Sequence, residues 1–291
     1  MKTKYKYMLT GFLFVLPSFL YYIFVFLYPL ILSFINATCK VNLMMGTKTF
    51  IGMQNFRNLF SRDYFWQSLT ITIQFALMSV PLVMMVDLFV ADCLAKVKGK
   101  KGNILTTLSF LPFIVSMAAA GMVWDWLLDP NLGLYNSLLN LFHLPQPLWL
   151  RSPATALYST MLITLWIRAP FGTMILLGGI QNIPEQLNEA ASLDGVSGLQ
   201  RFLKITLPLI NPQLIMVLTL ETIFAFKAFD QIFTSTGGGP AGSTRTLMIY
   251  LIKDLFNTDY GMASALTVLL LIVLFIISLL QQTLLKRKVD Y

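Results

Sequence analysis

The segment EAASLDGVSGLQRFLKITLPLINP, from Glu189 to Pro212, is a polar stretch between two long apolar runs. Residues 185–193 are mostly good helix formers, and Pro184 before them suits the start of a helix, where its missing N–H costs little. Gly195 can adopt the left-handed backbone conformation that ends a helix. A second short helix is predicted over residues 197–205. The segment therefore predicts two short helices joined by a sharp break.

The composition around this segment is typical of an integral membrane protein. The 291 residues are 56% hydrophobic and 12% charged, and soluble domains carry about 25% charged residues. A helix needs about 20 mainly apolar residues to cross the hydrocarbon core. Six runs reach that length: Leu9–Phe34, Gln67–Cys93, Ile104–Leu128, Ala154–Ile180, Pro208–Phe233 and Met262–Leu285. We therefore predict an all-α fold with six transmembrane helices, in a single membrane domain over residues 1–291.

Lysine and arginine residues are unevenly divided between the predicted connecting segments. With the N-terminus inside, twelve lie on the inner side and seven on the outer side. Because cytoplasmic loops carry the excess of basic residues, both termini are expected in the cytoplasm. The net charge of +8 then reflects topology and contact with anionic lipid, and it does not indicate a nucleic-acid partner. The inner set is Lys2, Lys4, Lys6, Lys96, Lys98, Lys100, Lys101, Arg201, Lys204, Lys286, Arg287 and Lys288; the outer set is Lys40, Lys48, Arg57, Arg62, Arg151, Arg245 and Lys253.

The residue types needed for catalysis or metal binding are scarce. His143 is the only histidine, which excludes a histidine metal cluster and leaves the spans without a histidine base. The GKKGN segment at Gly99 lacks the spacing and the hydroxyl of a phosphate-binding loop. We therefore expect no catalytic residue, metal or cofactor on this chain.

Seven short motifs accompany the polar segment along the chain. They are Tyr28-Pro29, FxGxxNF from Phe50, Leu111-Pro112, PxxGxxN from Pro130, Phe229-Asp230, TGGGP from Thr236 and GMASA from Gly261. In this order, over nearly the whole chain, they resemble the sugar-type permeases of ABC importers, the MalF/UgpA-like inner-membrane components of binding-protein-dependent transport systems. The segment from Glu189 is the most specific part of the resemblance, because it matches the cytoplasmic loop that docks on the ATPase.

The resemblance implies a type I (MetI-like) permease fold in the bacterial cytoplasmic membrane. It also implies four kinds of partner: a second homologous permease, two ATPase subunits that bind ATP and Mg, an extracytoplasmic solute-binding protein, and membrane lipid. The expected function is ATP-driven import of a carbohydrate by alternating access, the cargo being an oligosaccharide or an acidic sugar. Coupling to the ATPase is expected at Glu189, Ala190, Ala191, Asp194 and Gly195.

A helix that rests on lipid headgroups is the alternative interpretation of the polar segment. Such helices carry basic residues opposite their apolar face. Here Glu185, Glu189 and Asp194 precede the first base, Arg201, so the charge has the wrong sign for anionic lipid. Docking on the ATPase is favoured, with Ala190, Ala191 and Leu193 filling its groove and the two helices acting as a lever.

Two charged residues are predicted near the middle of spans, Arg168 in the fourth and Glu221 in the fifth. A charged group at that depth costs about 2.5–3.5 kcal/mol on insertion scales, so it needs a partner or a function. An Arg168–Glu221 ion pair that fixes helix register explains both residues, and so does contact with the passing solute. Trp166 and Phe171 flank Arg168 and offer ring faces on which a sugar can stack.

Buried carboxylates are also used by proton-coupled secondary transporters. Asp87 and Glu221 therefore support that class as an alternative function. Lys227 and Asp230 are three residues apart, which predicts a local pair on one helical face.

The last outer loop opens with Gly237, Gly238, Gly239 and Pro240. Because glycine lets another chain approach the backbone closely, this loop is predicted to face the solute-binding protein. A loop that only connects two helices is the alternative interpretation.

Overall fold

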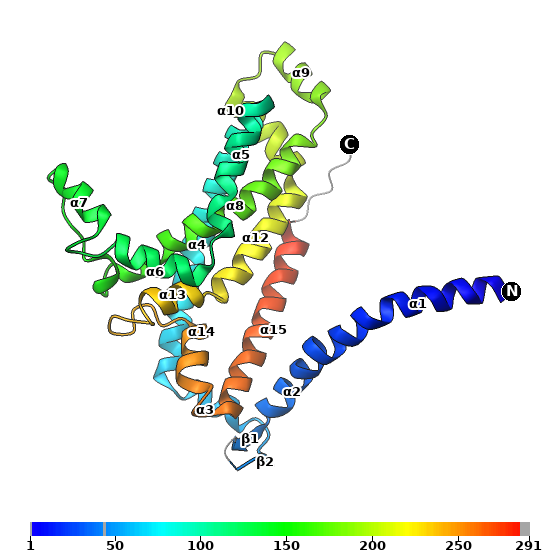
Figure 1. Cartoon of the computed structure of the whole chain (residues 1–291), viewed down its shortest axis with the longest axis vertical. Helices are drawn as coiled ribbons and strands as arrows, with labels where there is room; N and C mark the ends of the chain where they lie inside the picture. Colours follow the sequence, from blue (N-terminus) through cyan, green and yellow to red (C-terminus); the bar gives the residue numbers. More distant parts are fainter. Residues whose placement is uncertain (1, 43–44, 286–291) are drawn as a thin grey trace. The chain divides into compact units, whose positions relative to one another are not determined.

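The computed structural model describes residues 2–42 and 45–285, and the chain divides into two compact units. The first unit comprises Met1–Asp63 with Leu251–Val273, and the second Tyr64–Tyr250 with Leu274–Tyr291. Both contain helices of membrane-spanning length (Figure 1), so the division separates no soluble part from a membrane part. The single transmembrane domain over residues 1–291 stays a prediction. Lys286, Arg287 and Lys288, predicted on the inner side, lie outside the described residues.

The first unit begins with a long helical stretch. Its elements are α1 (Lys2–Tyr22), the π-helical η1 (Ile23–Leu27), α2 (Tyr28–Ala37), the antiparallel strands β1 (Cys39–Asn42) and β2 (Thr47–Phe50), and α3 (Gln54–Phe60). The apolar part of the stretch, Thr10–Ala37, is long enough to cross a membrane. The amide of Asn55 donates to the carbonyl oxygens of Ala37 and Cys39 at 2.9 and 2.8 Å, which fixes the hairpin to the end of α2.

The second unit holds most of the helices. They are α4 (Asp63–Ala95), α5 (Gly99–Ile114), α6 (Met117–Leu127), α7 (Leu134–Leu141), the 3-10 turn η2 (Trp149–Arg151), α8 (Ala156–Gln181), α9 (Glu185–Leu193), α10 (Gly198–Arg201), the π-helical η3 (Phe202–Thr206), α11 (Leu207–Leu209), α12 (Asn211–Phe226), α13 (Asp230–Ser235) and α14 (Leu247–Ile249); the chain continues through the π-helical η4 (Tyr250–Leu255) and α15 (Tyr260–Leu285). In the described residues, four unbroken helices can span a membrane, or six spans if each of two bent helix pairs counts as one. The four coincide with the first, second, fourth and sixth predicted spans.

The third predicted span, Ile104–Leu128, is wrong as a single straight helix. Its place is taken by α5 and α6, whose axes differ by 93°. Pro112 removes a backbone N–H from the last turn of α5, and Val115 takes an extended conformation. The Ser116 hydroxyl then accepts a hydrogen bond from the N–H of Ala119 and caps the start of α6.

The fifth predicted span, Pro208–Phe233, is also broken. The helical stretch Gly198–Leu209 meets α12 at 76°, where Pro212 occupies the first turn of α12. At its other end α12 stops before Lys227, and Asp230 begins the separate helix α13. Lys227 and Asp230 therefore do not share a helical face, and the prediction that they do is wrong.

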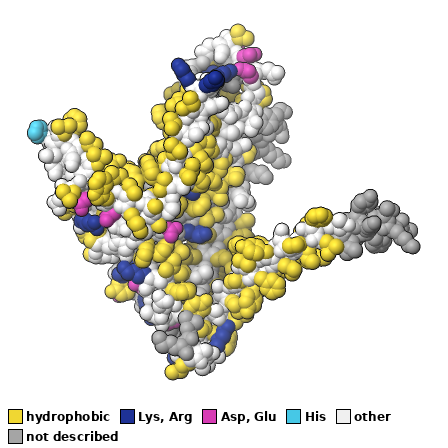
Figure 2. Space-filling model, viewed as in Figure 1, with side chains coloured by type: hydrophobic (Ala, Val, Ile, Leu, Met, Phe, Trp, Pro, Cys, Tyr) yellow, Lys and Arg dark blue, Asp and Glu magenta, His cyan; other side chains and the backbone are white. Residues whose placement is uncertain are grey.

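The helices of the second unit place two groups of short elements far apart. Figure 1 shows α9 and α10 at one end of α8 and α12, and α6 and α13 at the other. In Figure 2 hydrophobic side chains cover the helices between these ends, and a group of Lys, Arg, Asp and Glu side chains lies at the α9 end. The α9 end and the α6–α13 end therefore face opposite sides of the apolar layer.

Gly121 is the point where α6 packs against α13. A Cβ atom there would lie 2.9 Å from the carbonyl oxygen of Gln231 and would overlap the Thr234 hydroxyl. Gly121→Ala is therefore expected to force the helices apart and to cost about 1–3 kcal/mol, which a thermal unfolding curve of the purified protein measures. Gly178→Ala in α8 is the matched control, because no heavy atom lies within 4 Å of its Cβ position. Equal unfolding temperatures for the two variants would contradict this packing.

Candidate functional sites

The bent segment, residues Glu185–Leu209, has the two-helix structure that the sequence predicts. Gly195 takes a φ of +68° and ends the turn after α9. The Ser197 hydroxyl accepts from the Gln200 N–H at 3.4 Å, and the Gln200 side-chain oxygen accepts from the Ser197 N–H at 3.2 Å. This reciprocal capping starts the second helix, which continues to Leu209, beyond the predicted end.

Apolar side chains of the bent segment are left uncovered by the chain itself. Leu193 is 89% exposed, Leu199 70% and Leu203 52%. Ala190 is exposed, whereas Ala191 is 5% exposed and packs inside the chain. Of the three residues predicted to fill a partner's groove, Ala191 alone points inward. Exposed apolar side chains on an otherwise polar segment indicate a contact surface.

The acidic residues of the bent segment are exposed as well. Glu189 and Asp194 form no ion pair within the described residues. Glu185 differs, because its carboxylate lies 3.0 Å from the amine of Lys98, in the turn before α5. The bent segment therefore presents two acidic side chains, Glu189 and Asp194, that no described basic residue pairs with, beside its exposed leucines.

Arg168 of α8 and Glu221 of α12 form a bidentate ion pair. The Nη2 atom of Arg168 lies 2.7 Å from Oε1 of Glu221, and Nε donates to Oε2 at 3.2 Å. Each side chain is 3% exposed. Parallel hydrogen bonds of this kind are the strongest guanidinium–carboxylate geometry. The ion pair that the sequence offered as one explanation is present, and the charge of Arg168 is matched within the chain.

Three phenylalanine rings surround the Arg168 guanidinium, whose Cζ lies 3.5 Å from the ring centre of Phe224, 4.8 Å from Phe171 and 5.8 Å from Phe113. Phe171 also stacks on Phe113, with ring centres 5.3 Å apart. The sequence placed Phe171 here but missed the other two. Phe224 follows Glu221 by three residues on α12, a spacing that could have indicated it. Phe113 joins the group only because α5 packs on α8.

Trp166 is not one of the rings around Arg168. It packs edge-on against Trp124 of α6, with ring centres 6.0 Å apart. Trp124 in turn stacks on Tyr135 of α7, and Tyr135 meets Trp149 edge-on. This chain of rings connects α8 to α6, α7 and η2.

Asp87 of α4 is buried beside the ion pair. It is 0% exposed, and in the described part of the chain neither carboxylate oxygen has a hydrogen-bond partner. The sequence indicated that Asp87 is deep in the second span, but not that it lies close to Arg168 and Glu221.

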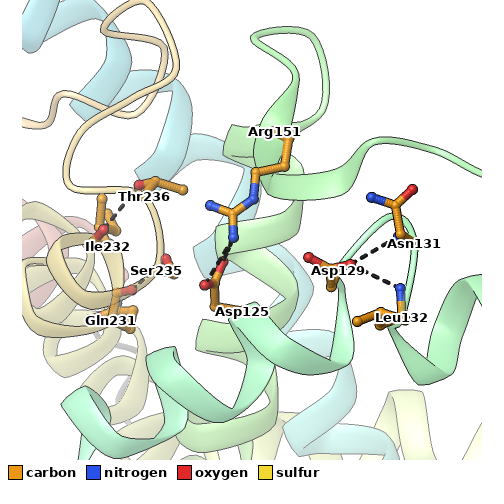
Figure 3. A network of polar contacts seen from close by, with 9 residues as sticks. All are labelled: Asp125, Asp129, Asn131, Leu132, Arg151, Gln231, Ile232, Ser235 and Thr236. Carbon is orange, nitrogen blue, oxygen red and sulfur yellow. Dashed lines mark hydrogen bonds and ion pairs between the residues drawn. The ribbon is translucent and has the colours of Figure 1, made fainter.

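A polar network joins the short elements at the α6–α13 end (Figure 3). Arg151 forms an ion pair with Asp125 of α6, with Nη2 and Oδ1 2.9 Å apart. The Asp129 carboxylate accepts from the N–H groups of Leu132 and Asn131, each at 2.9 Å, and these bonds lower the pKa of Asp129. The network fixes the turn between α6 and α7.

The glycine loop after α13, residues 237–240, has a backbone conformation that packing within the chain supports. Gly237 and Gly238 have φ values of +60° and +91°, and the Gly239–Pro240 bond is cis. Gly238 is buried, and a Cβ atom there would lie 2.9 Å from Cγ2 of Ile249. The loop leaves Gly237, Gly239 and Pro240 partly exposed for the predicted contact with a binding protein.

Among the described residues, no group of three or more His, Cys, Asp or Glu side chains could hold a metal ion.

Comparison with known proteins identifies the family. Residues 89–291 match the family of binding-protein-dependent transport system inner membrane components. The trehalose/maltose transport system permease protein MalF of Thermococcus litoralis is 32% identical over 92% of this chain and 90% of its own. The sn-glycerol-3-phosphate transport system permease protein UgpA of Pectobacterium atrosepticum is 30% identical over 83% of this chain and 82% of its own.

Solved structures share the fold. A bacterial ABC transporter involved in the import of the acidic polysaccharide alginate has a chain with a TM-score of 0.84 and 21% identity, covering 99% of this chain and 98% of its own. The alginate transporter in complex with its pentasaccharide-bound periplasmic protein gives a TM-score of 0.83 at 21% identity, covering 97% of this chain and 94% of its own. The fold is the type I (MetI-like) permease fold, and the proton-coupled alternative is wrong. This chain belongs to the binding-protein-dependent transport system inner membrane components, the permease subunits of ABC importers.

Proposed function

We propose that this chain is one permease subunit of an importer that moves a carbohydrate across the cytoplasmic membrane. The observation that carries the proposal is its 32% identity, over 92% of its length, to a trehalose/maltose permease. The complete transporter contains a second homologous permease, two ATPase subunits that bind ATP and Mg, and an extracytoplasmic solute-binding protein. Both termini of this chain lie in the cytoplasm. This chain itself performs no covalent chemistry.

The bent segment transmits movement from the ATPase in this proposal. Leu193 and Ala190 enter a groove on the ATPase, and Glu189 and Asp194 make charged contacts at its rim. These side chains are exposed, and Gly195 fixes the angle between the two helices that carry them. Closure of the ATPase subunits on ATP then moves the bent segment as a rigid lever, and α8 and α12 at its two ends move with it. At the opposite membrane face, the loop of Gly237, Gly239 and Pro240 receives the binding protein.

The cargo is a neutral sugar in this proposal. The charge of Arg168 is matched by Glu221, and the buried Asp87 adds no positive charge, so these residues offer no excess positive charge to an acidic solute. Phe224 covers the guanidinium with one ring face and is 36% exposed elsewhere, and exposed aromatic rings stack on the C–H surfaces of sugars. Phe171 and Phe224 therefore line the pathway, and the ion pair holds their rings in place.

The cognate solute-binding protein provides the direct test. Its thermal unfolding is measured with trehalose and maltose as neutral probes, and with sn-glycerol 3-phosphate and an alginate pentasaccharide as acidic probes. We expect a neutral sugar to raise the unfolding temperature, and that sugar to enter proteoliposomes only when all subunits and ATP are present. Stabilisation by the acidic probes alone would contradict a neutral cargo. Uptake by this chain alone, driven by a pH gradient, would contradict the importer.

A further inference from the structure

Asp87 is a buried acid that forms no ion pair among the residues that the structure describes. The Thr173 hydroxyl is placed to donate to its carboxylate, and the charge of Arg168 acts on it. Among the described residues, however, no hydrogen bond of standard geometry reaches either oxygen. An unpaired ionisable group inside a membrane protein is costly, and such groups usually pair with one another or take part in transport. An acid kept in this environment is therefore expected to have a partner in another state of the molecule.

The position of Asp87 identifies that partner. A methyl group built on Gly172 would lie 2.6 Å from the carboxyl carbon of Asp87 and 2.9 Å from Cγ1 of Val217, so all three meet in one layer. Gly172 follows Arg168 by four residues on α8, and Val217 precedes Glu221 by four residues on α12. Measured along the helix axes, Asp87 therefore lies at a level about one turn, or roughly 5.4 Å, from the ion pair.

Gly172 removes the obstacle to movement between the helices. Because residue 172 has no side chain, the Asp87 carboxylate rests against the backbone of α8. Packed elements shift by about 1–2 Å in many transitions, and in more drastic ones by a full turn, roughly 5.4 Å. A slide of α4 along α8 by that distance, or a rotation of the long Arg168 side chain, brings the guanidinium to Asp87.

We propose that Asp87 is the alternative counter-ion of Arg168. Glu221 holds the guanidinium in the conformation described here, and Asp87 holds it in the opposite state of the transport cycle. Arg168 can then pair with either Glu221 or Asp87, which gives two discrete arrangements of the helices. A conformational switch requires two such arrangements. The inference rests on the proposed function, because only an alternating-access transporter needs the second state.

The test compares the stability of two states. The complete transporter is reconstituted in nanodiscs with Asp87→Asn in this chain, and its thermal unfolding is followed without nucleotide and after trapping with Mg-ATP and vanadate. Asparagine removes a buried ionisable group without an ion-pair partner in the state described and a paired carboxylate in the other. We therefore expect shifts of opposite sign, each about 2–4 °C, the scale of a single-site effect in a domain of this size. Shifts of the same sign in both states, or no shift, would overturn the proposal.

Asp92→Asn is the matched control. Asp92 lies on the same helix, is partly exposed and pairs with Lys96 one turn away, so its replacement is expected to change the unfolding temperature equally in both states.

A second measurement combines Glu221→Gln with Asp87→Asn. Because each acid can serve Arg168 when the other is absent, the double variant is expected to lose more stability than the sum of the single variants. Additive losses would count against the proposal. Failure of the wild-type complex to hydrolyse ATP would instead refute the proposed function, and the inference with it.

Discussion

Gly195→Val is expected to abolish transport while the permease remains folded in the membrane. Residue 195 has a φ of +68°, which a β-branched residue adopts only as an outlier. The left-handed conformation costs a residue with a Cβ about 1–2 kcal/mol, so the backbone between α9 and α10 is expected to change its angle. A change of this angle alters the position of Leu193 relative to Leu199, so the two side chains can no longer contact a partner together. Binding-protein-stimulated ATP hydrolysis and sugar uptake by proteoliposomes should each fall at least tenfold.

Gly198→Val separates this effect from the general effect of a larger side chain. Neither glycine has a heavy atom within 4 Å of its Cβ position, so neither substitution creates a clash inside the chain. Of these two glycines, Gly195 has a positive φ and Gly198 does not. We expect Gly198→Val to retain most of the uptake, since valine is no worse a helix former than glycine, which is itself about 1 kcal/mol less favourable than alanine. Uptake by Gly195→Val equal to that of Gly198→Val would contradict the lever.

The bent segment was predictable because its signals are local. Gly195 ends one helix through its own backbone preference, and Ser197 starts the next through a hydrogen bond three residues away. The span of α8 was predictable for a related reason, since its length and composition alone meet the requirement for crossing a membrane. Neither feature depends on contacts with distant parts of the chain.

The bends in the third and fifth spans could not be predicted in the same way. Hydropathy reports how apolar a segment is, and it contains no information on the direction of the helix axis. Proline does not decide the question either. Pro81 and Pro170 lie inside the unbroken helices α4 and α8, whereas Pro112 lies next to the 93° bend. The difference is that α6 finds a packing surface on α13, at Gly121. That contact joins residues more than a hundred positions apart, and no local pattern contains it.

The charged site was predictable in part. Arg168 and Glu221 attracted attention because charge is rare at that depth, and their similar depth allowed the pairing. The place of Asp87 depends on how α4 rests on Gly172, and a glycine in an apolar span is not distinctive by itself. Tertiary packing therefore decides which buried charges share a site.

Arg168→Met is expected to destabilise the protein strongly. It leaves Glu221 without its counter-ion and Asp87 without the nearby positive charge, and both acids are buried. Removing one partner of a buried ion pair typically costs about 3–5 kcal/mol. Methionine has a similar length and preserves packing against Phe171 and Phe224. The loss of stability therefore measures the effect of removing the positive charge. We expect little folded protein in the membrane fraction, measured by size-exclusion profiles after mild detergent extraction.

The double variant Arg168→Met/Glu221→Leu distinguishes the two explanations of the pair. Replacing a buried ion pair by apolar residues of similar volume is often neutral, or stabilises by about 1–4 kcal/mol, so folded protein should return. If the pair only fixed helix register, uptake by reconstituted transporter would return with it. We expect stability without uptake, because residue 168 then carries no charge that could pair with one acid and then the other. The rings of Phe171 and Phe224 also lose the cation that holds them. Full recovery of uptake would show that the charges are dispensable for transport.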